Sequence, residues 1–258
     1  RAAARNKPVI VLKAGRAPEG AKAAASHTGA LAGADDVYDA AIRRAGMLRV
    51  DTVLELFEAV ETLARARTPY TDQLAILTNG GGPGVMATDA IGASGVRLAE
   101  LRPEVIAALD EFLPPTWSHG NPVDIIGDAP TERYVKTLQH LLKESGIGAV
   151  LFIHVPTAIV PSVDIARACA PLAKEGRVLS CWLGGDAVEP ARRVFQDAGI
   201  PTYETPEEAV RAFGRLIQYR RNQQALMETP DSIPRDFSPD TARVRAIVET
   251  AIKDGRKW

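Results

Sequence analysis

The sequence predicts a parallel α/β fold, and two observations support this prediction. Short runs rich in β-branched residues alternate with longer segments whose apolar residues recur at helical spacing. Several of the short runs are apolar throughout, as Val9–Leu12 is, which is typical of strands buried on both faces of a sheet. With 258 residues, the chain is long enough for one large domain or two domains of ordinary size.

The predicted elements alternate along the chain. Strands are expected at 8–13, 48–50, 74–78, 96–98, 149–154, 178–183 and 201–203. A helix is expected over 52–67, where Thr52 and Glu55 form a capping box and five apolar residues share one face: Val53, Leu56, Phe57, Val60 and Leu63. Further helices are expected to begin near Asp35, after the glycines of 80–84, at Thr205 with Pro206 in the first turn, and at Asp240.

Two polar, proline-containing breaks, at 67–72 and 229–234, divide the chain. Residues 71–228 are predicted to form a complete α/β unit, followed by a linker and one helix over 229–258. Residues 1–70 offer about two strands and two helices, which are too few to cover both faces of a parallel sheet. We therefore expect the first unit to be truncated, with exposed apolar edges that favour self-association, and the chain to be a piece of a longer polypeptide.

Composition narrows the class of protein. Apolar residues make up 46% and charged residues 24%, which is typical of a soluble globular protein. The net charge of −1 gives no reason to expect a nucleic acid or an anionic membrane as a partner. Cys169 and Cys181 lack metal-ligand spacing, so no zinc site is predicted and a reduced, cytoplasmic setting is expected. No segment is long and apolar enough to predict a membrane span.

The first candidate for chemistry is His27, in the run Ser26-His27-Thr28-Gly29 that continues to Gly33. Its small neighbours would leave the imidazole accessible in a loop, where Ser26, Thr28 and Gly29 could donate hydrogen bonds to an anion. A neutral imidazole is a nucleophile at physiological pH and can carry a phosphoryl group. The alternative is a loop histidine bonded only to backbone. A carboxylate that would orient His27 is not evident, because Asp35 and Asp36 could simply cap the next helix.

The second candidate is the glycine-rich turn Asn79-Gly80-Gly81-Gly82-Pro83-Gly84, placed between a predicted strand and a predicted helix. Such a turn presents backbone N–H groups and the positive end of a helix to an anion. It is neither a Walker A loop nor a convincing dinucleotide fingerprint. A tight turn without any ligand is the alternative interpretation.

A third loop, 117–124, contains Asn121 and Asp124, which could support an anion site or form only internal hydrogen bonds. His119 in this loop is expected to be structural, and His140 to be solvated on a polar helix. His154 ends a predicted strand at the carboxyl edge of the sheet, where ligands gather in α/β proteins.

Taken together, these motifs resemble the nucleoside-diphosphate-forming acyl-CoA synthetases, the superfamily of succinyl-CoA synthetase and ADP-forming acetyl-CoA synthetase. The stretches 7–15, 26–33, 79–84 and 121–124 match in type and order, and the resemblance covers nearly the whole chain. It implies two flavodoxin-like units. It also implies that His27 is the phosphorylated residue, and that Gly80, Gly81, Gly82 and Gly84 head a helix facing the phosphohistidine.

The resemblance further implies CoA, ATP or ADP with Mg²⁺, phosphate and a short carboxylic acid as ligands of the parent protein, bound mainly outside this chain. Residues 1–70 would be the C-terminal half of the phosphohistidine domain, 71–228 a second ligase domain, and 229–258 the approach to an ATP-grasp domain. A CoA-binding domain would precede them, and a homo-oligomer is expected. The isolated chain would be inactive.

Two alternatives stay open. Some long single-chain members of this family carry a fused acetyltransferase domain and act on protein lysines, and the stretches 117–128, 201–206 and 219–223 resemble that subgroup. A non-catalytic module that binds acyl-CoA or a nucleotide is the other. The presence of His27 favours a working synthetase.

Overall fold

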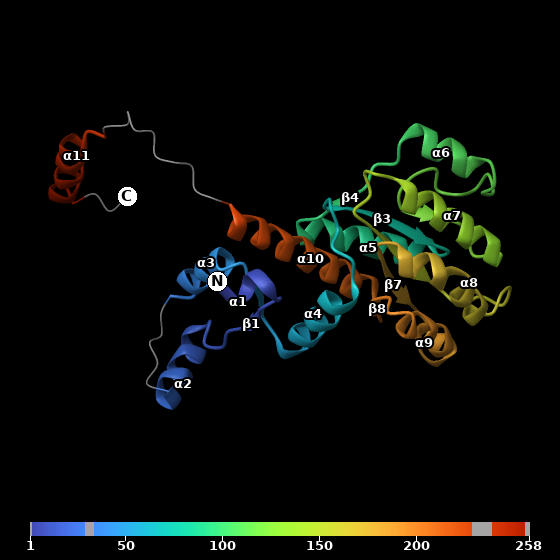
Figure 1. The fold of residues 1–258 in the computed structure, drawn as a ribbon, viewed down its shortest axis with the longest axis horizontal. Helices are drawn as coiled ribbons and strands as arrows, with labels where there is room; N and C mark the ends of the chain where they lie inside the picture. The colour runs from blue at the N-terminus through green and yellow to red at the C-terminus, as the bar shows by residue number, and fades with distance from the viewer. Residues whose placement is uncertain (1, 29–33, 229–238, 256–258) are drawn as a thin grey trace. The chain divides into compact units, whose positions relative to one another are not determined.

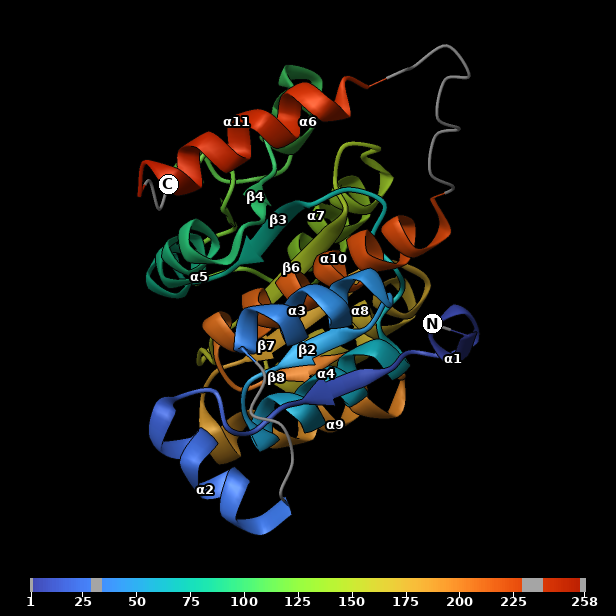
Figure 2. The same ribbon diagram turned by 90° about the vertical axis from the view of Figure 1, so that its left-hand side faces the viewer.

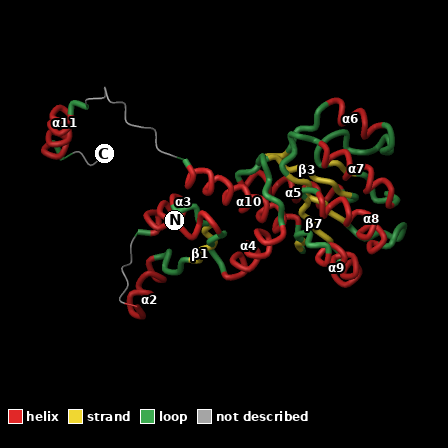
Figure 3. The backbone as a smooth tube through the Cα atoms, viewed as in Figure 1, coloured by secondary structure: helices red, strands yellow, loops and turns green. Residues whose placement is uncertain are grey.

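The computed structural model describes residues 2–28, 34–228 and 239–255, and the chain divides into two units, Arg1–Leu226 and Met227–Trp258. Each unit is described by itself. Figure 1 labels the helices and strands, and Figure 3 shows that the strands of the larger unit fall into two separate groups.

The larger group is a six-stranded sheet in which every recorded pairing is parallel. Its strands are β3 (Gln73–Thr78), β4 (Arg97–Leu98), β5 (Val123–Asp124), β6 (Ala149–His154), β7 (Val178–Trp182) and β8 (Thr202–Tyr203). Their spatial order is β4-β3-β6-β7-β8, with β5 also beside β3. This order, in which the first strand of the unit lies between the second and the third major strands, is the flavodoxin-like one. The predicted fold class is confirmed.

Helices cover both faces of this sheet (Figures 1 and 2). One face is covered by α6 (Pro103–Asp110), α7 (Thr131–Lys143), α8 (Ser162–Glu175) and α9 (Glu189–Asp197), which follows a 3₁₀ turn at Gly185–Val188. The other face is covered by α5 (Gly81–Ser94) and α10 (Pro206–Met227). Strand β6 shows the reason: Val150 and Phe152 enter the first core, Leu151 and Ile153 the second, and all four are buried. An apolar residue at every position is what a strand covered on both faces requires.

The first part of the chain forms a smaller group. It contains α1 (Ala2–Asn6), β1 (Ile10–Leu12), α2 (Pro18–Thr28), α3 (Asp35–Arg44), β2 (Leu48–Val50) and α4 (Val53–Arg65). Strands β1 and β2 pair in parallel, with Ile10 opposite Leu48. A small core of Leu48, Val50 and Ala59 lies between these strands and α4.

Helix α10 holds the two groups together, because one side of it packs on the six-stranded sheet while polar side chains near its C-terminal end reach the first segment. Asn222 Nδ2 donates to the carbonyl of Met47 at 2.6 Å, and Gln223 Nε2 donates to the carbonyl of Gly46 at 2.6 Å. Gly46 has a φ of +74°, and a Cβ there would lie 2.5 Å from Leu226 Cδ2, so only glycine fits this turn.

Arg215, also on α10, donates to Glu58 of α4 at 2.6 Å and pairs with Glu55 at 3.2 Å. The hydroxyls of Thr62 and Tyr203 share a buried hydrogen bond of 2.7 Å that links α4 to β8. These contacts account for the compactness of residues 1–226 despite the two separate sheets.

All seven predicted strands are confirmed, as are the caps of Thr52 and Thr205, whose hydroxyls accept from the N–H of Glu55 and Glu208. Two elements were not predicted from the sequence. Helix α2 was missed, so Ser26, His27 and Thr28 lie in its last turn instead of in a loop. Strand β5 was also missed.

The structure also settles two details of the predicted helices α3 and α4. Asp35 does not cap α3, whose N-cap is Ala34 with no side-chain bond. The predicted apolar face of α4 is split: Leu56 and Leu63 turn toward the core, whereas Val53, Phe57 and Val60 are more than half exposed. Exposed apolar surface on the first segment was expected from the sequence and is present, whereas self-association stays a prediction.

The second unit contains α11 (Thr241–Lys253), which begins where Asp240 accepts a hydrogen bond from the N–H of Arg243 at 3.0 Å. Within the described ranges, no helix is both long and apolar enough to cross a bilayer.

Candidate anion site at the carboxyl edge of the sheet

The glycine-rich turn lies where the strand order reverses. Strand β6 lies on one side of β3, and β4 and β5 lie on the other side. The connections that follow β3 and β6 therefore leave the carboxyl edge of the sheet in opposite directions. In open α/β sheets this switch point is the usual place for a ligand. Gly80 is the N-cap of α5, which therefore begins at the switch point.

The first turn of α5 offers two backbone donors. Gly84 N–H bonds to the carbonyl of Gly80 at 3.3 Å, and Pro83 has no N–H. Among the described residues no acceptor is recorded for the N–H groups of Gly81 and Gly82. Two free donors at the positive end of a helix of fourteen residues are suited to an anion.

Hydrogen bonds to neighbouring segments fix the loop itself. Asn79 is buried, and its side chain bonds to both backbone groups of Val155, accepting from the N–H and donating to the carbonyl, each at 2.8 Å. Thr78 Oγ1 accepts from the N–H of Gly80 at 3.0 Å and donates to its carbonyl at 2.9 Å. These bonds join the ends of β3 and β6, so Asn79 positions the loop, and its predicted role in binding phosphate stays a prediction.

Three of the four glycines lie against close neighbours. A Cβ on Gly80 would lie 3.1 Å from Val155 Cγ2, and one on Gly84 would lie 3.2 Å from Thr78 Cγ2. A Cβ on Gly81 would lie 3.1 Å from Asp124 Oδ2, whereas one on Gly82 would meet nothing within 4 Å. Packing therefore explains every glycine of the turn except Gly82.

Asn121 and Asp124 make internal hydrogen bonds, which was one of the two interpretations open from the sequence. Asn121 accepts from the N–H of Ile76 at 2.9 Å and donates to the carbonyls of Leu74 and Ala99 at 3.0 and 2.8 Å. Its amide thereby bridges the gap between β4 and β5 along the edge of β3. Asp124 Oδ1 accepts from the N–H of Ile126 at 2.9 Å, and its Oδ2 lies beside Gly81. An anion bound there would have this carboxylate near it.

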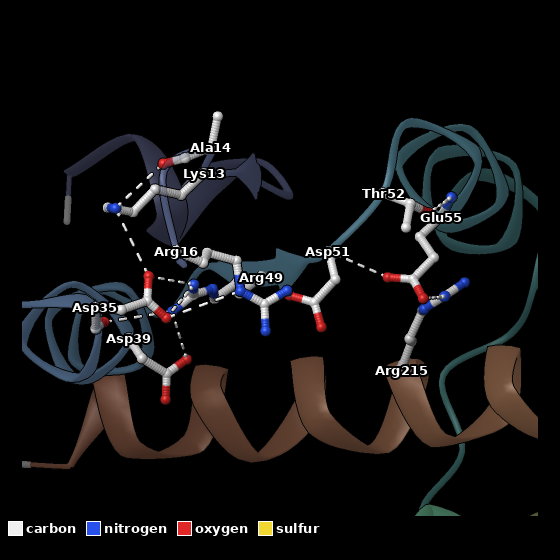
Figure 4. Close-up of polar contacts among 10 residues, drawn as sticks. All are labelled: Lys13, Ala14, Arg16, Asp35, Asp39, Arg49, Asp51, Thr52, Glu55 and Arg215. Atoms are coloured by element: carbon white, nitrogen blue, oxygen red, sulfur yellow. Dashed lines mark hydrogen bonds and ion pairs between the residues drawn. The ribbon is translucent and has the colours of Figure 1, made fainter. Parts of the chain in front are cut away.

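His27 lies in the last turn of α2, while its side chain and Gly29 are outside the described residues. A group of ion pairs, shown in Figure 4, holds the segment from which α2 starts. Arg16, two residues before α2, pairs with Asp51 at 2.5 Å and Asp35 at 3.9 Å. Arg49 lies between them and donates to both oxygens of Asp35 at 2.7 Å.

The same hydrogen bond lowers the pKa of Asp35 and raises that of Arg49, so both groups stay charged. Lys13, directly after β1, adds a second cation 3.6 Å from Asp35. The ends of β1 and β2 and the start of α3 are thereby joined around the approach to α2. The Asp35 carboxylate therefore pairs with three cations, and these ion pairs hold the start of α3 to the strands β1 and β2.

His154 is a buried residue that the sequence placed at the carboxyl edge but could not explain. Its Nδ1 lies 3.2 Å from the hydroxyl of Tyr134, and its Nε2 lies 2.9 Å from Ser162 Oγ. Burial lowers the pKa of His154 from 6.5 to about 4, so the ring is neutral at physiological pH. The ring joins β6 to α7 and to the first residue of α8. It precedes Val155, to which Asn79 is bonded.

The remaining histidines are peripheral. His119 is exposed and packs on Trp117, with Nδ1 3.0 Å from Asp110 Oδ1, as expected of a structural residue. His140 is half-buried on α7 rather than fully solvated, and its ring packs 5.4 Å from that of Phe112.

Comparisons with known proteins agree with this architecture. Residues 1–63 match the succinyl-CoA ligase-like flavodoxin domain, and residues 74–227 match the Ligase-CoA domain. The chain belongs to the nucleoside-diphosphate-forming acyl-CoA synthetase superfamily. Among members of this superfamily, it is 40% identical over 254 residues to an ADP-forming acetate–CoA ligase of Archaeoglobus fulgidus, covering 98% of this chain and 36% of that protein.

Other members of the superfamily are similarly close. An ADP-forming 4-hydroxybutyrate–CoA ligase of Nitrosopumilus maritimus is 34% identical over 97% of this chain and 35% of its own length. A solved acetyl-coenzyme A synthetase 1 of Candidatus Korarchaeum cryptofilum, in complex with phosphate and ADP, matches with a TM-score of 0.82 and 33% identity. That match covers 89% of this chain and 50% of the solved one. This chain therefore spans about a third to a half of these relatives.

Proposed function

We propose that this chain is part of an ADP-forming acyl-CoA synthetase, with His27 as the phosphoryl carrier and the first turn of α5 as an anion site. The observation that carries the proposal is the pair of free N–H groups of Gly81 and Gly82, at the switch point of a sheet in this superfamily. A solved relative was obtained with phosphate and ADP, which supports phosphate as the anion.

The proposed reaction interconverts acyl-CoA, ADP and phosphate with a short carboxylic acid, CoA and ATP. A phosphate oxygen attacks the thioester carbonyl, the C–S bond breaks, and CoA leaves as its thiolate. A nitrogen of the neutral His27 ring then attacks phosphorus of the acyl phosphate, and the P–O bond breaks to release the carboxylate. The phosphoryl group on His27 passes to the terminal phosphate of ADP, which regenerates the imidazole.

The chain's own contribution would be to hold charge that develops on the phosphoryl oxygens. The N–H groups of Gly81 and Gly82 and the positive end of α5 supply fixed dipoles that need no reorganisation during the reaction. Asn79 and Thr78 keep these dipoles in place through their bonds to Val155 and Gly80.

The resemblance that implies this reaction also implies Mg²⁺ with the nucleotide. No cluster of three or more His, Cys, Asp or Glu suited to a metal is found in the part of the chain that the structure describes. We accordingly assign no metal ligand to these residues. We propose that CoA and the nucleotide bind mainly through further domains of the protein. The division of this chain into domains at 1–70, 71–228 and 229–258 is also part of the proposal.

Phosphorylation of the full-length protein tests the proposal. The wild type, His27→Ala and His140→Ala are each mixed with Mg²⁺ and γ-labelled ATP, and the label is tested for acid lability and alkali stability. We expect labelling of the wild type and His140→Ala, discharge of the label by added ADP, and none in His27→Ala. A blank wild type, or labelling of His27→Ala, would remove His27 from the mechanism.

A further inference from the structure

A cavity of about 510 Å³ opens at the amino edge of the six-stranded sheet, the opposite edge from the glycine-rich turn. Its walls include the first residues of β6 and the residue before β7, together with the C-terminal ends of α7 and α8. Leu142, Ile147 and Leu172 provide an apolar wall. A volume of this size is typical of small-molecule sites, and none of the steps proposed above uses it.

Two cations line this cavity without a carboxylate partner. In the described part of the chain, neither Lys143 nor Arg177 makes a recorded ion pair or side-chain hydrogen bond. The guanidinium carbon of Arg177 lies over the ring of Tyr70, 4.1 Å from its centroid, and this contact uses none of the five N–H donors of the guanidinium in a hydrogen bond. Glu175, the acidic residue of the lining, is paired with Arg67 at 3.4 Å. The cavity therefore has an excess of positive charge beside an apolar wall.

Tyr70 links the cavity to the segment that joins α4 to β3. It belongs to the segment 66–72 between α4 and β3, and its hydroxyl donates to the carbonyl of Glu144 at 3.0 Å. The Arg67–Glu175 pair holds the same segment to the end of α8. An occupant of the cavity would contact this segment and both helix ends at once.

We propose that the cavity binds an organic monocarboxylate with an apolar chain or ring. The apolar body would lie against Leu142, Ile147 and Leu172, and the carboxylate would accept hydrogen bonds from the guanidinium of Arg177 and the ammonium of Lys143. A phosphate ester is less suited, because it carries a charge of about −1.5 to −2 at pH 7, and desolvating that charge beside an apolar wall costs more than desolvating one carboxylate. Since the ligand would join the segment 66–72 to the sheet, its binding should stabilise residues 1–226.

The test uses octanoate as the probe, titrated into the protein by calorimetry at neutral pH. The first variant is Lys143→Glu, and its matched control is Lys136→Glu, an exposed lysine on the same helix that does not line the cavity. We expect octanoate to bind the wild type and the control alike, and to bind Lys143→Glu about tenfold more weakly. The uncharged analogue 1-octanol should bind the wild type about tenfold more weakly than octanoate.

A second variant, Arg177→Gln, tests the cation that lies beside Tyr70. Its thermal unfolding without ligand shows whether the variant is folded. Octanoate should raise the melting temperature of the wild type and of Lys136→Glu but not of Arg177→Gln. Absence of octanoate binding, equal binding by Lys136→Glu and Lys143→Glu, or equal binding of 1-octanol would overturn the proposal. None of these outcomes depends on whether His27 carries a phosphoryl group.

Discussion

Acidification should destabilise this protein through His154, because the folded structure has no place for a charged imidazole at that position. Both ring nitrogens face hydroxyl groups, those of Tyr134 and Ser162, and the ring packs 5.0 Å from that of Trp182. A neutral ring can donate to one hydroxyl and accept from the other. A protonated ring would be a buried cation with no recorded carboxylate beside it in the described residues, which is unfavourable.

The size of the effect follows from the pKa. Burial lowers the pKa of His154 from 6.5 to about 4, so the unfolded chain binds the proton more tightly than the folded protein does. The stabilisation is complete above pH 6.5 and is lost progressively as the pH falls toward the folded pKa. Between these limits the free energy of unfolding should fall by about 1.4 kcal/mol per pH unit. By about pH 5 the loss from this residue alone should be about 2 kcal/mol.

The assay is urea unfolding followed by circular dichroism at about pH 7 and about pH 5, for the wild type and His154→Gln. Glutamine can still donate to one hydroxyl and accept from the other, but it does not titrate, so the variant should lose about 2 kcal/mol less than the wild type between the two pH values. The control is His140→Gln on α7, which should lose as much as the wild type. If His154→Gln and the wild type lose equal stability, His154 is not excluded from protonation and the reasoning fails. Should the variant be too unstable to measure, an NMR titration of the His154 ring in the wild type decides the same point.

Three further experiments test the hydrogen bonds and packing around the candidate site and between α10 and α4. Asn121→Ala should lower the free energy of unfolding by about 2–3 kcal/mol in a urea titration, because it leaves buried backbone groups without partners, and a loss below about 1 kcal/mol would contradict the bridging role. Gly84→Ala should lower the free energy of unfolding, measured by thermal unfolding, by about 1 kcal/mol, whereas Gly82→Ala should leave it unchanged or raise it slightly. The reason is that, of these two positions, only Gly82 has room for a Cβ. The reverse order of stabilities would refute the packing argument. In a double-mutant cycle, Arg215→Met and Glu58→Gln should show a coupling of about 1–3 kcal/mol, and simple additivity would mean that the pair does not join α10 to α4.

The sequence predicted the sheet well for a physical reason. Strands buried on both faces carry apolar residues at every position, so runs such as 149–154 are visible without any knowledge of their partners. Strand β5 gives no such signal, because it has two residues and pairs with β3 through backbone groups, which carry no side-chain pattern. Helix α2 was missed because its Ser-His-Thr end was interpreted as a loop, although the preceding alanines are strong helix formers.

Contacts across long sequence separations could not be predicted from one sequence. The location of the glycine-rich turn was predictable, because carboxyl ends of parallel strands meet at one edge of a sheet. The role of Asn79 was not, because its partner, Val155, is 76 residues away and is bonded through its backbone, which carries no side-chain signal. The exposure of one side of α4 could not be predicted for a related reason: helical periodicity shows that Val53, Phe57 and Val60 share a face, but not what lies against it.

The glycines of the turn 79–84 are weaker evidence for an anion than their number suggests. A Cβ on Gly80, Gly81 or Gly84 would press on Val155, Asp124 or Thr78, so the close packing favours glycine at these positions even if nothing ever bound there. The missing side-chain cap of α5 is not evidence either, because α6, α7 and α8 also lack one and a glycine N-cap costs only a few tenths of a kcal/mol. What distinguishes α5 is that its free N–H groups lie at the switch point, where a ligand could supply an acceptor. Anion affinity at Gly81 and Gly82, rather than the glycine motif itself, is therefore the property that separates a working synthetase site from a tight turn.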